Sequence, residues 1–460
     1  MKRLILDIST LARWTGPPVG MIRAESELYR AASAMGLPME PAFFDPSRAA
    51  FRRLNPAYAA KVLGWHGTID CYGIDYVLRR QGWRRSLPSR LAIVQWLERR
   101  RLTSGSPLIQ RAADLLQRAV LMVRRHTFPF QTGDGMRVAF VPHDLALAES
   151  FNPGPEDTIL SASSDWQWKD PAAIAALKHR TGCRIAVVCY DIIPITHPCF
   201  FPPDDAATFR RYWDAMFSIA DTVIVNAGPI RDDIVRYRNA AGAPVPSIAV
   251  VPLGCQPSTL AGRVASLPSG LQTDRFVLFV STIEPRKNHA LLLDVWTRLL
   301  ARDLVRKAGF RLVFVGRPGW MTDDVLDRIG HMGDSVLHLR NAGDDVLWAL
   351  CAGAAFCVYP SIYEGFGLPV VEAFALGKAV IASNGGALKD VAGAVVETLD
   401  PTDIDAWEAA MAAMMRDPSA RRACEARVRE RYRPVSWHDA AAAMLAESGF
   451  NGRDSLDPPR

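Results

Sequence analysis

The fold of this protein is indicated most strongly by one stretch of its sequence, residues 359–383, which reads YPSIYEGFGLPVVEAFALGKAVIAS. An apolar run ends at the first residue of this stretch, as a buried strand would, and a helix-forming run begins at about Leu368. Gly365 and Gly367 lie between the two and allow the backbone to approach a ligand closely. Pro369 suits the first turn of a helix, where its missing N–H costs nothing. The pattern predicts a strand, a glycine turn and a helix whose free amides face an anion or sugar hydroxyls.

Two glutamates flank this predicted turn. Glu364 lies just before the helix and Glu372 one turn inside it, so both carboxylates can face one ligand. An ionised carboxylate makes stronger hydrogen bonds than a neutral acceptor, which suits it to hold vicinal hydroxyl groups. A helix cap and a surface charge would explain the two glutamates separately. The complete block, with its glycines, its proline and the strand that follows, favours a ligand site instead.

A second block, FVSTIEPRKNH at residues 279–289, also leaves an apolar strand and enters a helix, which is predicted at 290–300. The adjacent Arg286 and Lys287 are poorly placed for the helix dipole, whose positive end lies at the N-terminus. A basic pair is expected there if its side chains and the helix start hold a diphosphate together. The alternative is solvated surface charge. His289 is predicted to pack or to cap the helix rather than to bind a ligand.

Short apolar strands alternate with helical segments along most of the chain. Strands are predicted at 4–8, 137–141, 158–162, 184–190, 222–225, 247–251, 276–280, 312–315, 335–339, 355–359 and 379–382. Helices are predicted at 21–34, 171–179, 204–219, 229–237 and 437–446. Such alternation produces parallel sheets with helices on both faces. The fold class is therefore α/β, with two domains and a ligand site predicted in the cleft between them.

The domain boundaries are predicted from changes in this pattern. Residues 1–254 form a first domain with a basic insert at about 40–135, and 255–273 form a linker in a stretch that lacks periodicity. A second domain is expected over 274–434, a helix that crosses back to the first domain over 435–450, and a tail over 451–460.

The composition is that of an ordinary globular protein. The chain has 460 residues, of which 49% are hydrophobic and 22% charged, and 54 Lys+Arg against 48 Asp+Glu give a formal charge of +6. These values exclude a disordered, collagen-like or coiled-coil chain. The 8 cysteines form no CxxC or metal-ligand spacing, as is typical of buried thiols in a reducing compartment. Because no signal peptide or spanning segment is predicted, we expect a cytoplasmic protein.

Positive charge is concentrated in residues 79–125. Twelve arginines and only two acids, Glu98 and Asp114, give this segment +10, which leaves −4 for the rest of the chain. Apolar residues that include Trp96 recur beside the arginines at helical spacing. Such a helix is typical of a surface that contacts anionic lipid, here at the inner face of the membrane, or phosphate. A solvated helical hairpin packed on its own domain is the alternative, and nucleic acid is a weaker one because no recognition motif is present.

Both blocks, together with GRPG at 316–319 and VPLG at 251–254, resemble the family-4 retaining glycosyltransferases of GT-B fold. The hallmark of that family is a pair of glutamates with seven residues between them, which matches Glu364 and Glu372. The resemblance implies two Rossmann-like doubly wound domains that face a central cleft. It is dense from about residue 276 to 446, thinner over 1–34 and 184–254, and absent over roughly 40–135.

The resemblance also implies a role for each matching residue. Glu364 would contact the donor sugar as a catalytic residue, Glu372 would bind the ribose and Lys287 the diphosphate. The sugar would also meet backbone amides, and a Gly-rich loop of the first domain would close over the phosphates. The residues in these two groups are Gly365, Phe366, Gly367 and Leu368 for the amides, and Gly16 and Gly20 for the loop. Enzymes of this kind need no bound metal and no cofactor.

Two positions depart from the family pattern. Many members carry an arginine six residues before the lysine, where this chain has Ser281. We therefore expect Arg286 to supply the second positive charge, and Ser281 and Thr282 to line the donor site. Many members also have His-Asp where this chain has Tyr190-Asp191. Asp191 is then the predicted catalytic polar residue on the sugar side.

The segment TIEPRKN at 282–288 looks like the branch that includes mannosyltransferases of bacterial surface-polysaccharide assembly. The sequence thus predicts a retaining hexosyltransferase that moves mannose from GDP-mannose to a saccharide or lipid-linked saccharide acceptor. A UDP-sugar-dependent enzyme of the same fold and an inactive nucleotide-sugar-binding scaffold remain alternatives. A nucleotide-sugar epimerase is less favoured. A nicotinamide enzyme is less favoured still, because no GxGxxG follows the first strand.

Overall fold

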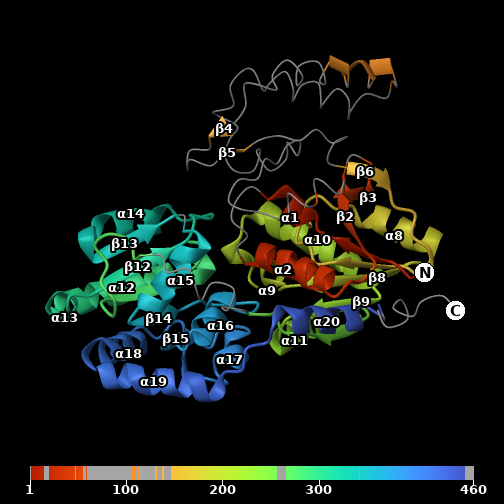
Figure 1. Ribbon diagram of the computed structural model, residues 1–460. Helices are drawn as coiled ribbons and strands as arrows, with labels where there is room; N and C mark the ends of the chain where they lie inside the picture. The colour runs from red at the N-terminus through yellow and green to blue at the C-terminus, as the bar shows by residue number, and fades with distance from the viewer. Residues whose placement is uncertain are drawn as a thin grey trace. The chain divides into compact units, whose positions relative to one another are not determined.

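The computed structural model describes residues 2–14, 20–46, 48–54, 147–255, 266–340 and 342–450, together with isolated residues between 59 and 138 (Figure 1). Gly16 and most of the basic segment 79–125 lie outside the described residues. The chain divides into two compact units, residues 1–30 with 38–183 and residues 31–37 with 184–460, and each is described by itself. In the described parts of both units, no helix combines the length and apolar character needed to cross a membrane.

A mixed sheet forms the centre of the first unit. Its strands are β1 (Leu4–Asp7), β2 (Met39–Asp45), β3 (Ala50–Leu54), β6 (Leu147–Ser150) and β7 (Thr158–Ser161). β1 pairs in parallel with β2 and β7, whereas β3 is antiparallel to β2 and β6. All four residues of β1 are buried, as expected for an apolar strand with a neighbour on each side. Two further short strands, β4 (Phe130–Gln131) and β5 (Arg137–Val138), pair with each other.

The helices of the first unit are α1 (Ser9–Arg13), α2 (Met21–Ala34), which extends past Arg30, and α8 (Pro171–Thr181). Local sequence explains the bounds of α8. The side chain of Asp170 accepts a hydrogen bond from the amide of Ala172, and proline occupies the first helical position. The helix ends at Gly182, whose φ of 68° lies in the left-handed region that glycine adopts readily.

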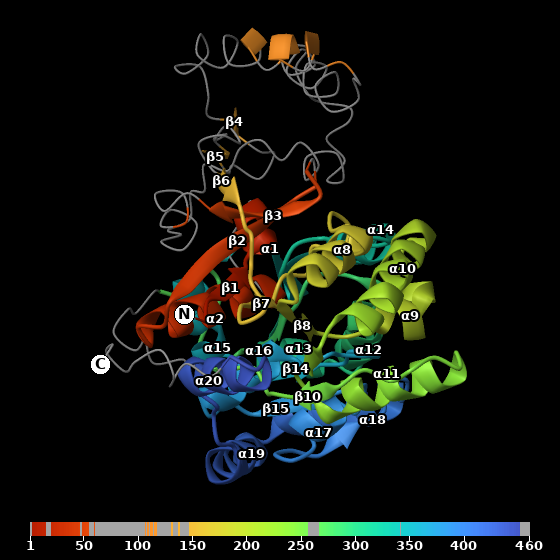
Figure 2. The ribbon, with the colours of Figure 1, turned by 90° about the vertical axis from the view of Figure 1, so that its right-hand side faces the viewer.

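Three parallel strands open the second unit, namely β8 (Arg184–Cys189), β9 (Thr222–Val225) and β10 (Ile248–Val250). The helices that follow them are α9 (Ile193–Thr196), α10 (Pro203–Ile219) and α11 (Gly228–Ala240), with a 3-10 turn η2 (Pro198–Phe200). α11 packs against β9 and β10 (Figure 2). The last helix, α20 (Trp437–Glu447), contacts β9 as well.

Six parallel strands form the other sheet of this unit, in the order β13-β12-β11-β14-β15-β16. They are β11 (Phe276–Val280), β12 (Arg311–Val315), β13 (Val336–Leu339), β14 (Phe356–Tyr359), β15 (Val380–Ser383) and β16 (Thr398–Leu399). The strand order reverses between β11 and β14. Doubly wound sheets bind their ligands outside the carboxyl ends of the strands at such a reversal. Since the two sequence blocks follow β11 and β14, both lie at this place.

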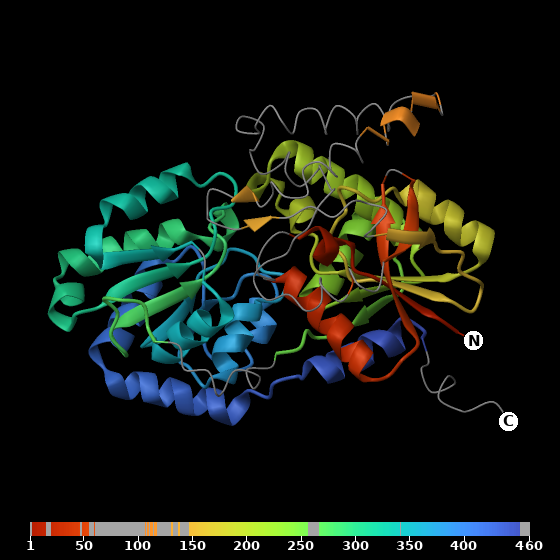
Figure 3. The same cartoon turned by 45° about the horizontal axis from the view of Figure 1, so that its top comes forward.

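Helices cover both faces of the six-stranded sheet (Figure 3). They are α12 (His289–Ala301), α13 (Leu304–Ala308), α14 (Asp323–His331), α15 (Asp344–Gly353), α16 (Leu368–Ala375), α17 (Leu388–Val391), α18 (Ile404–Arg416) and α19 (Pro418–Arg431). α12 packs against α18, and each contributes a completely buried tryptophan, Trp296 and Trp407.

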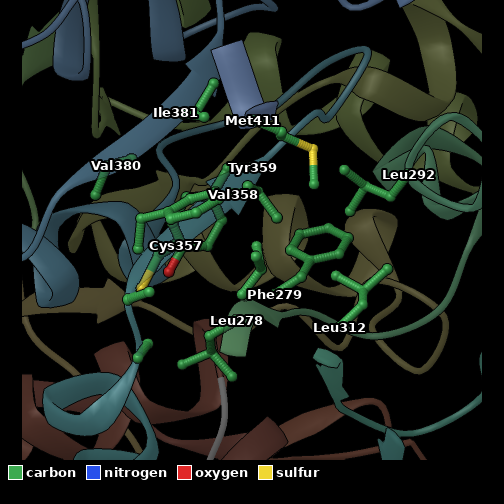
Figure 4. Packing of buried hydrophobic residues seen from close by; sticks show 14 of the residues in the cluster. Leu278, Phe279, Leu292, Leu312, Cys357, Val358, Tyr359, Val380, Ile381 and Met411 are labelled. Carbon is green, nitrogen blue, oxygen red and sulfur yellow. The ribbon is translucent and has the colours of Figure 1, made fainter. Parts of the chain in front are cut away.

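The core of this domain lies between the central strands and these helices. Phe279 of β11 packs among Leu292, Leu312 and Met411 (Figure 4). Its ring centroid is 5.9 Å from that of Tyr359 at the end of β14. Both residues are almost fully buried just before their strands end, so the two functional loops start from a rigid base.

Candidate active site

The two loops at the carboxyl ends of β11 and β14 are joined by direct contacts. A 3-10 turn, η4 (Pro285–Lys287), follows β11, and Asn288 with φ 61° separates it from α12. The amide side chain of Asn288 donates to the carbonyls of Pro360 at 3.2 Å and Pro401 at 2.8 Å. The amide of Ile362 donates to the carbonyl of Arg286 at 2.8 Å. These contacts fix the two loops relative to each other.

Glu364 is held by two cations and a hydroxyl. Arg286 donates from Nη1 to Oε2 at 2.8 Å, and Lys287 donates from Nζ to Oε1. The hydroxyl of Ser361 donates to Oε1 at 2.7 Å. Burial would raise the pKa of Glu364, but the charges of Lys287 and Arg286 and these hydrogen bonds outweigh it, so the pKa falls from 4.5 to about 2. Glu364 is therefore an ionised acceptor at neutral pH.

A stability measurement can test this ionisation. A carboxyl whose folded pKa lies below its unfolded value stabilises the fold above the unfolded pKa, and this contribution is lost as the pH falls toward the folded pKa. For Glu364 the window runs from 4.5 down to about 2. Between pH 6 and pH 3, the free energy of unfolding should fall by about 2 kcal/mol more in the wild type than in Glu364→Gln. Urea titrations at both pH values would measure it, and equal losses in the two proteins would contradict the assignment.

The two cations are buried in a set of carboxylates. Arg286 also pairs through Nη2 with Glu284 at 2.8 Å and donates from Nη1 to the carbonyl of Tyr363 at 3.1 Å. Burial would lower the pKa of Arg286, but the charges of Glu284, Glu364 and Asp191 raise it overall. Burial and the adjacent Arg286 lower the pKa of Lys287 from its ordinary value. The fixed positive charges thus lie beside fixed negative ones, as a preorganised site requires.

Asp191 comes from a different strand and reaches the same place. It follows the end of β8, and its Oδ1 accepts a hydrogen bond from the amide of Ile193 at 3.0 Å. A Cβ on Gly365 would lie 3.2 Å from its Oδ2 and 2.5 Å from the carbonyl oxygen of Tyr190. Burial raises the pKa of Asp191, and the charge of Arg286 opposes that rise. Glycine at 365 is therefore what allows this approach.

The glycine turn and helix predicted after β14 are confirmed. α16 begins at Leu368 with Gly367 as its N-cap at φ 88°, a conformation that favours glycine. Pro369 occupies the first turn, and Phe366 and Leu368 are buried beside it. The amides at the start of an α-helix have no partner within the helix. This start is therefore a place where a ligand can accept hydrogen bonds from the backbone.

The structure also describes four other residues that were predicted for the site. Glu372 is half-buried in the second turn of α16. Ser281 is half-buried and donates its hydroxyl to the carbonyl of Thr282 at 2.9 Å, and Thr282 is exposed. Gly20 is exposed in the first unit, directly before α2, with φ 53°. The structure therefore brings Asp191, Arg286, Lys287, Glu364 and Gly365 together.

The GRPG segment packs on the loop after β11. Gly316 has φ 154°, and a Cβ there would lie 2.0 Å from the carbonyl oxygen of Ser281. The amide of Gly319 donates to the carbonyl of Ile283 at 2.8 Å, and the amide of Ile283 donates to that of Arg317 at 2.9 Å. Glycine is thus required by close backbone packing, which explains why this short motif accompanies the second block.

Several residues of the site were not predicted. Glu284 and Ser361, which hold Arg286 and Glu364, lie inside the two blocks but were not singled out. Tyr363 donates its hydroxyl to Asp233 of α11, a contact across 130 positions of sequence. Their location inside the two sequence blocks was the signal that could have indicated a role in the site. Their partners depend on the tertiary fold.

This geometry places the charged site of an α/β domain at the switch point of a doubly wound sheet, where such folds bind their ligands. Residues 268–431 match the family model described as Glycosyl transferases group 1. That segment is therefore a glycosyltransferase domain of this family, and the predicted family resemblance is confirmed.

Individual relatives agree with this assignment. The chain is 28% identical over 370 residues to O-antigen chain mannosyltransferase B of Escherichia coli, covering 78% of this chain and 92% of that protein. It is 32% identical over 201 residues to MMP alpha-(1->4)-mannosyltransferase of Mycolicibacterium hassiacum, covering 43% and 47%. The solved sucrose-phosphate synthase of Thermosynechococcus elongatus aligns with a TM-score of 0.57 at 17% identity, covering 97% and 98%. The GT-B fold is thereby confirmed.

Proposed function

We propose that the protein is a retaining, nucleotide-sugar-dependent mannosyltransferase of polysaccharide assembly. GDP-mannose would be the donor, and a saccharide or lipid-linked saccharide the acceptor. The observation that supports this most is the ionised Glu364 between Lys287 and Arg286 at the carboxyl ends of β11 and β14. The names of the two relatives, both mannosyltransferases, support mannose as the sugar.

In this proposal the domain at 274–434 holds the donor. Lys287 and Arg286 bind the diphosphate, whose negative charge competes with Glu364 for the two cations. The amides of the Gly365–Leu368 turn and the carboxylate of Glu364 then bind the hydroxyls of the sugar. Glu372 binds the ribose, while Ser281 and Thr282 line the donor. Gly16 and Gly20 belong to the loop that closes over the phosphates.

The reaction keeps the configuration at the anomeric carbon. The bond from C1 to the diphosphate oxygen breaks, and the acceptor oxygen forms a new bond to C1 on the same face. The proton of the acceptor hydroxyl passes to the departing phosphate oxygen. Glu364 orients the cation-like sugar and donates no proton, since its pKa is about 2. Asp191, beside Gly365, is the second polar group on the sugar side.

A donor panel tests this proposal. Calorimetry should show that GDP-mannose binds more tightly than UDP-sugars, and transfer to a mannose-containing oligosaccharide should give the α-linked product by NMR. Tighter binding of a UDP-sugar would replace the donor assignment by the alternative within the same fold. Tight binding without transfer to any acceptor would indicate a scaffold, and an inverted product would contradict retention.

We also propose that the enzyme is peripheral at the inner face of the membrane, where a lipid-linked acceptor would be found. The support is the charge of +10 over residues 79–125, most of which lie outside the described residues. Each Lys or Arg near an anionic surface contributes about 1 kcal/mol, and salt reduces this attraction.

Vesicle binding should therefore depend on charge. The full chain is expected to sediment with vesicles that contain anionic lipid and to stay in solution with neutral vesicles, and added salt should release it. Equal binding to both vesicle types, or no binding at low salt, would contradict charge-dependent membrane binding and favour the alternative, a helical hairpin packed on its own domain. Sugar transfer to a soluble acceptor serves as the control, because it should not depend on vesicles.

A further inference from the structure

Tyr363 connects the Glu364 loop to a helix of another part of the fold. Its hydroxyl donates a hydrogen bond to Oδ2 of Asp233, which lies on α11. Asp233 is buried and also accepts from Arg236 at 2.8 Å. The ring of Tyr363 lies 4.5 Å from that of His197, which follows α9. Two side chains from the β8–β10 part of the unit therefore hold this tyrosine.

The same residue contacts the cation of the site through its backbone. The carbonyl oxygen of Tyr363 accepts from Nη1 of Arg286 at 3.1 Å, and that nitrogen also donates to Glu364 at 2.8 Å. Because Glu364 is the next residue, a shift of the tyrosine backbone would displace Arg286 and Glu364 together. Room for the ring depends on Gly386, where a Cβ would lie 2.7 Å from Cε1 of Tyr363.

The hydroxyl is suited to this contact at all physiological pH values. Burial raises the pKa of Tyr363 well above its ordinary value, and the hydrogen bond to Asp233 and its charge raise it further. Tyr363 therefore keeps its proton and remains a donor to the carboxylate. Hydrogen bonds to charged groups are stronger than those between neutral groups.

We infer that Tyr363 is a positioning residue for sugar transfer, which holds Glu364 and Arg286 in register through its hydrogen bond to Asp233. This inference rests on the proposed function, since it concerns the rate of that reaction. In this role Tyr363 needs no contact with the reacting atoms. It acts by fixing the backbone from which Glu364 projects and to which Arg286 donates. Small displacements of such groups lower rates strongly, because reactivity depends on alignment to within about an ångström.

The chain contains a matched control for this hydrogen bond. Tyr237, also on α11, donates its hydroxyl to Oδ1 of Asp214 at 2.8 Å. Its replacement by phenylalanine removes a tyrosine–aspartate hydrogen bond of the same kind. Neither partner contacts the Glu364 loop in the described contacts of the unit.

The test is a double-mutant cycle on kcat. Tyr363→Phe and Asp233→Ala should each lower kcat roughly tenfold or more, with donor affinity within about twofold of the wild type. The double variant should be no slower than either single variant, because the two changes remove one interaction. Asp233→Asn, which keeps an acceptor oxygen, should restore part of the rate, and Tyr237→Phe should leave kcat unchanged.

Each outcome has a separate meaning. If the wild type transfers no sugar to any acceptor, the proposed function fails, and the positioning role in sugar transfer fails with it. If the wild type is active but Tyr363→Phe keeps the wild-type kcat, or the two losses multiply in the double variant, the positioning role is wrong. Thermal unfolding midpoints show whether a variant is only less stable. If Tyr363→Phe and Tyr237→Phe lower the midpoint by the same amount and also lower kcat by the same factor, the inference is overturned.

Discussion

Replacement of Lys287 by alanine is expected to lower the rate of sugar transfer by about a hundredfold or more while the fold is kept. The Nζ of Lys287 lies against Glu364 at the carboxyl ends of β11 and β14, where the proposed diphosphate departs. A preorganised positive group acts on charge that develops in the transition state, and losing one such group costs roughly 3–4 kcal/mol. Steady-state transfer assays on the purified variant would measure the loss.

A surface lysine supplies the control for this variant. Lys307 lies in α13, outside the loops that follow β11 and β14. Its side chain is 76% exposed and pairs with Asp303 at 3.3 Å. Lys307→Ala should transfer sugar at the wild-type rate, because exposed ion pairs contribute little. Circular dichroism should show both variants folded. Wild-type turnover in Lys287→Ala would refute the diphosphate assignment, because the variant lacks the positive charge that is proposed to stabilise the departing diphosphate.

Local patterns were sufficient to predict most elements near the site. β9 and β11 occupy residues 222–225 and 276–280, as predicted, and α16 begins at Leu368. The two strands are short apolar runs, and α16 has Gly367 before its first residue and Pro369 in its first turn. In such elements the burial of the side chains and the local backbone preference agree, so the local sequence pattern is enough to predict them.

The loop after β11 was predicted less well. The pair Arg286 and Lys287 was expected at the start of a helix at 290–300, whereas the structure has a separate 3-10 turn followed by α12 at His289–Ala301. Asn288 makes the break because asparagine tolerates the left-handed conformation. Its side chain is held by carbonyls 72 and 113 positions away, which no local pattern reveals.

The same limit applies to the site itself. The residues that the blocks contain, among them Glu364 and Lys287, were predicted, because charged groups beside glycines at the end of a strand indicate a ligand site. The pairing of these charges was not predicted. Glu284 and Glu364 share Arg286, while Asp233 pairs with Arg236, and only the tertiary fold decides these pairings. The first-unit strands β2 and β3, which lie within residues 39–54, were also missed.

The two glutamates of the hallmark should differ in what their loss does to kinetics. Glu364→Gln keeps the size of the side chain but removes the charge that holds Arg286 and Lys287. In the proposed reaction Glu364 orients the sugar in the transition state, so without its charge kcat should fall on the order of a hundredfold. The two cations lose a competing carboxylate, and GDP should therefore bind as tightly as in the wild type or more tightly.

Glu372→Gln supplies the matched contrast, because it makes the same chemical change one turn inside α16. A ribose contact is made equally in the ground state and the transition state, so its loss weakens donor binding without changing kcat. Hydrogen bonds to charged groups are worth about 1.5–3 kcal/mol, which corresponds to roughly ten- to a hundredfold in donor affinity. Steady-state kinetics and GDP calorimetry on both variants separate the roles. A fall in kcat with unchanged donor affinity in Glu372→Gln, or an undiminished kcat in Glu364→Gln, would show that this division between the two carboxylates is wrong.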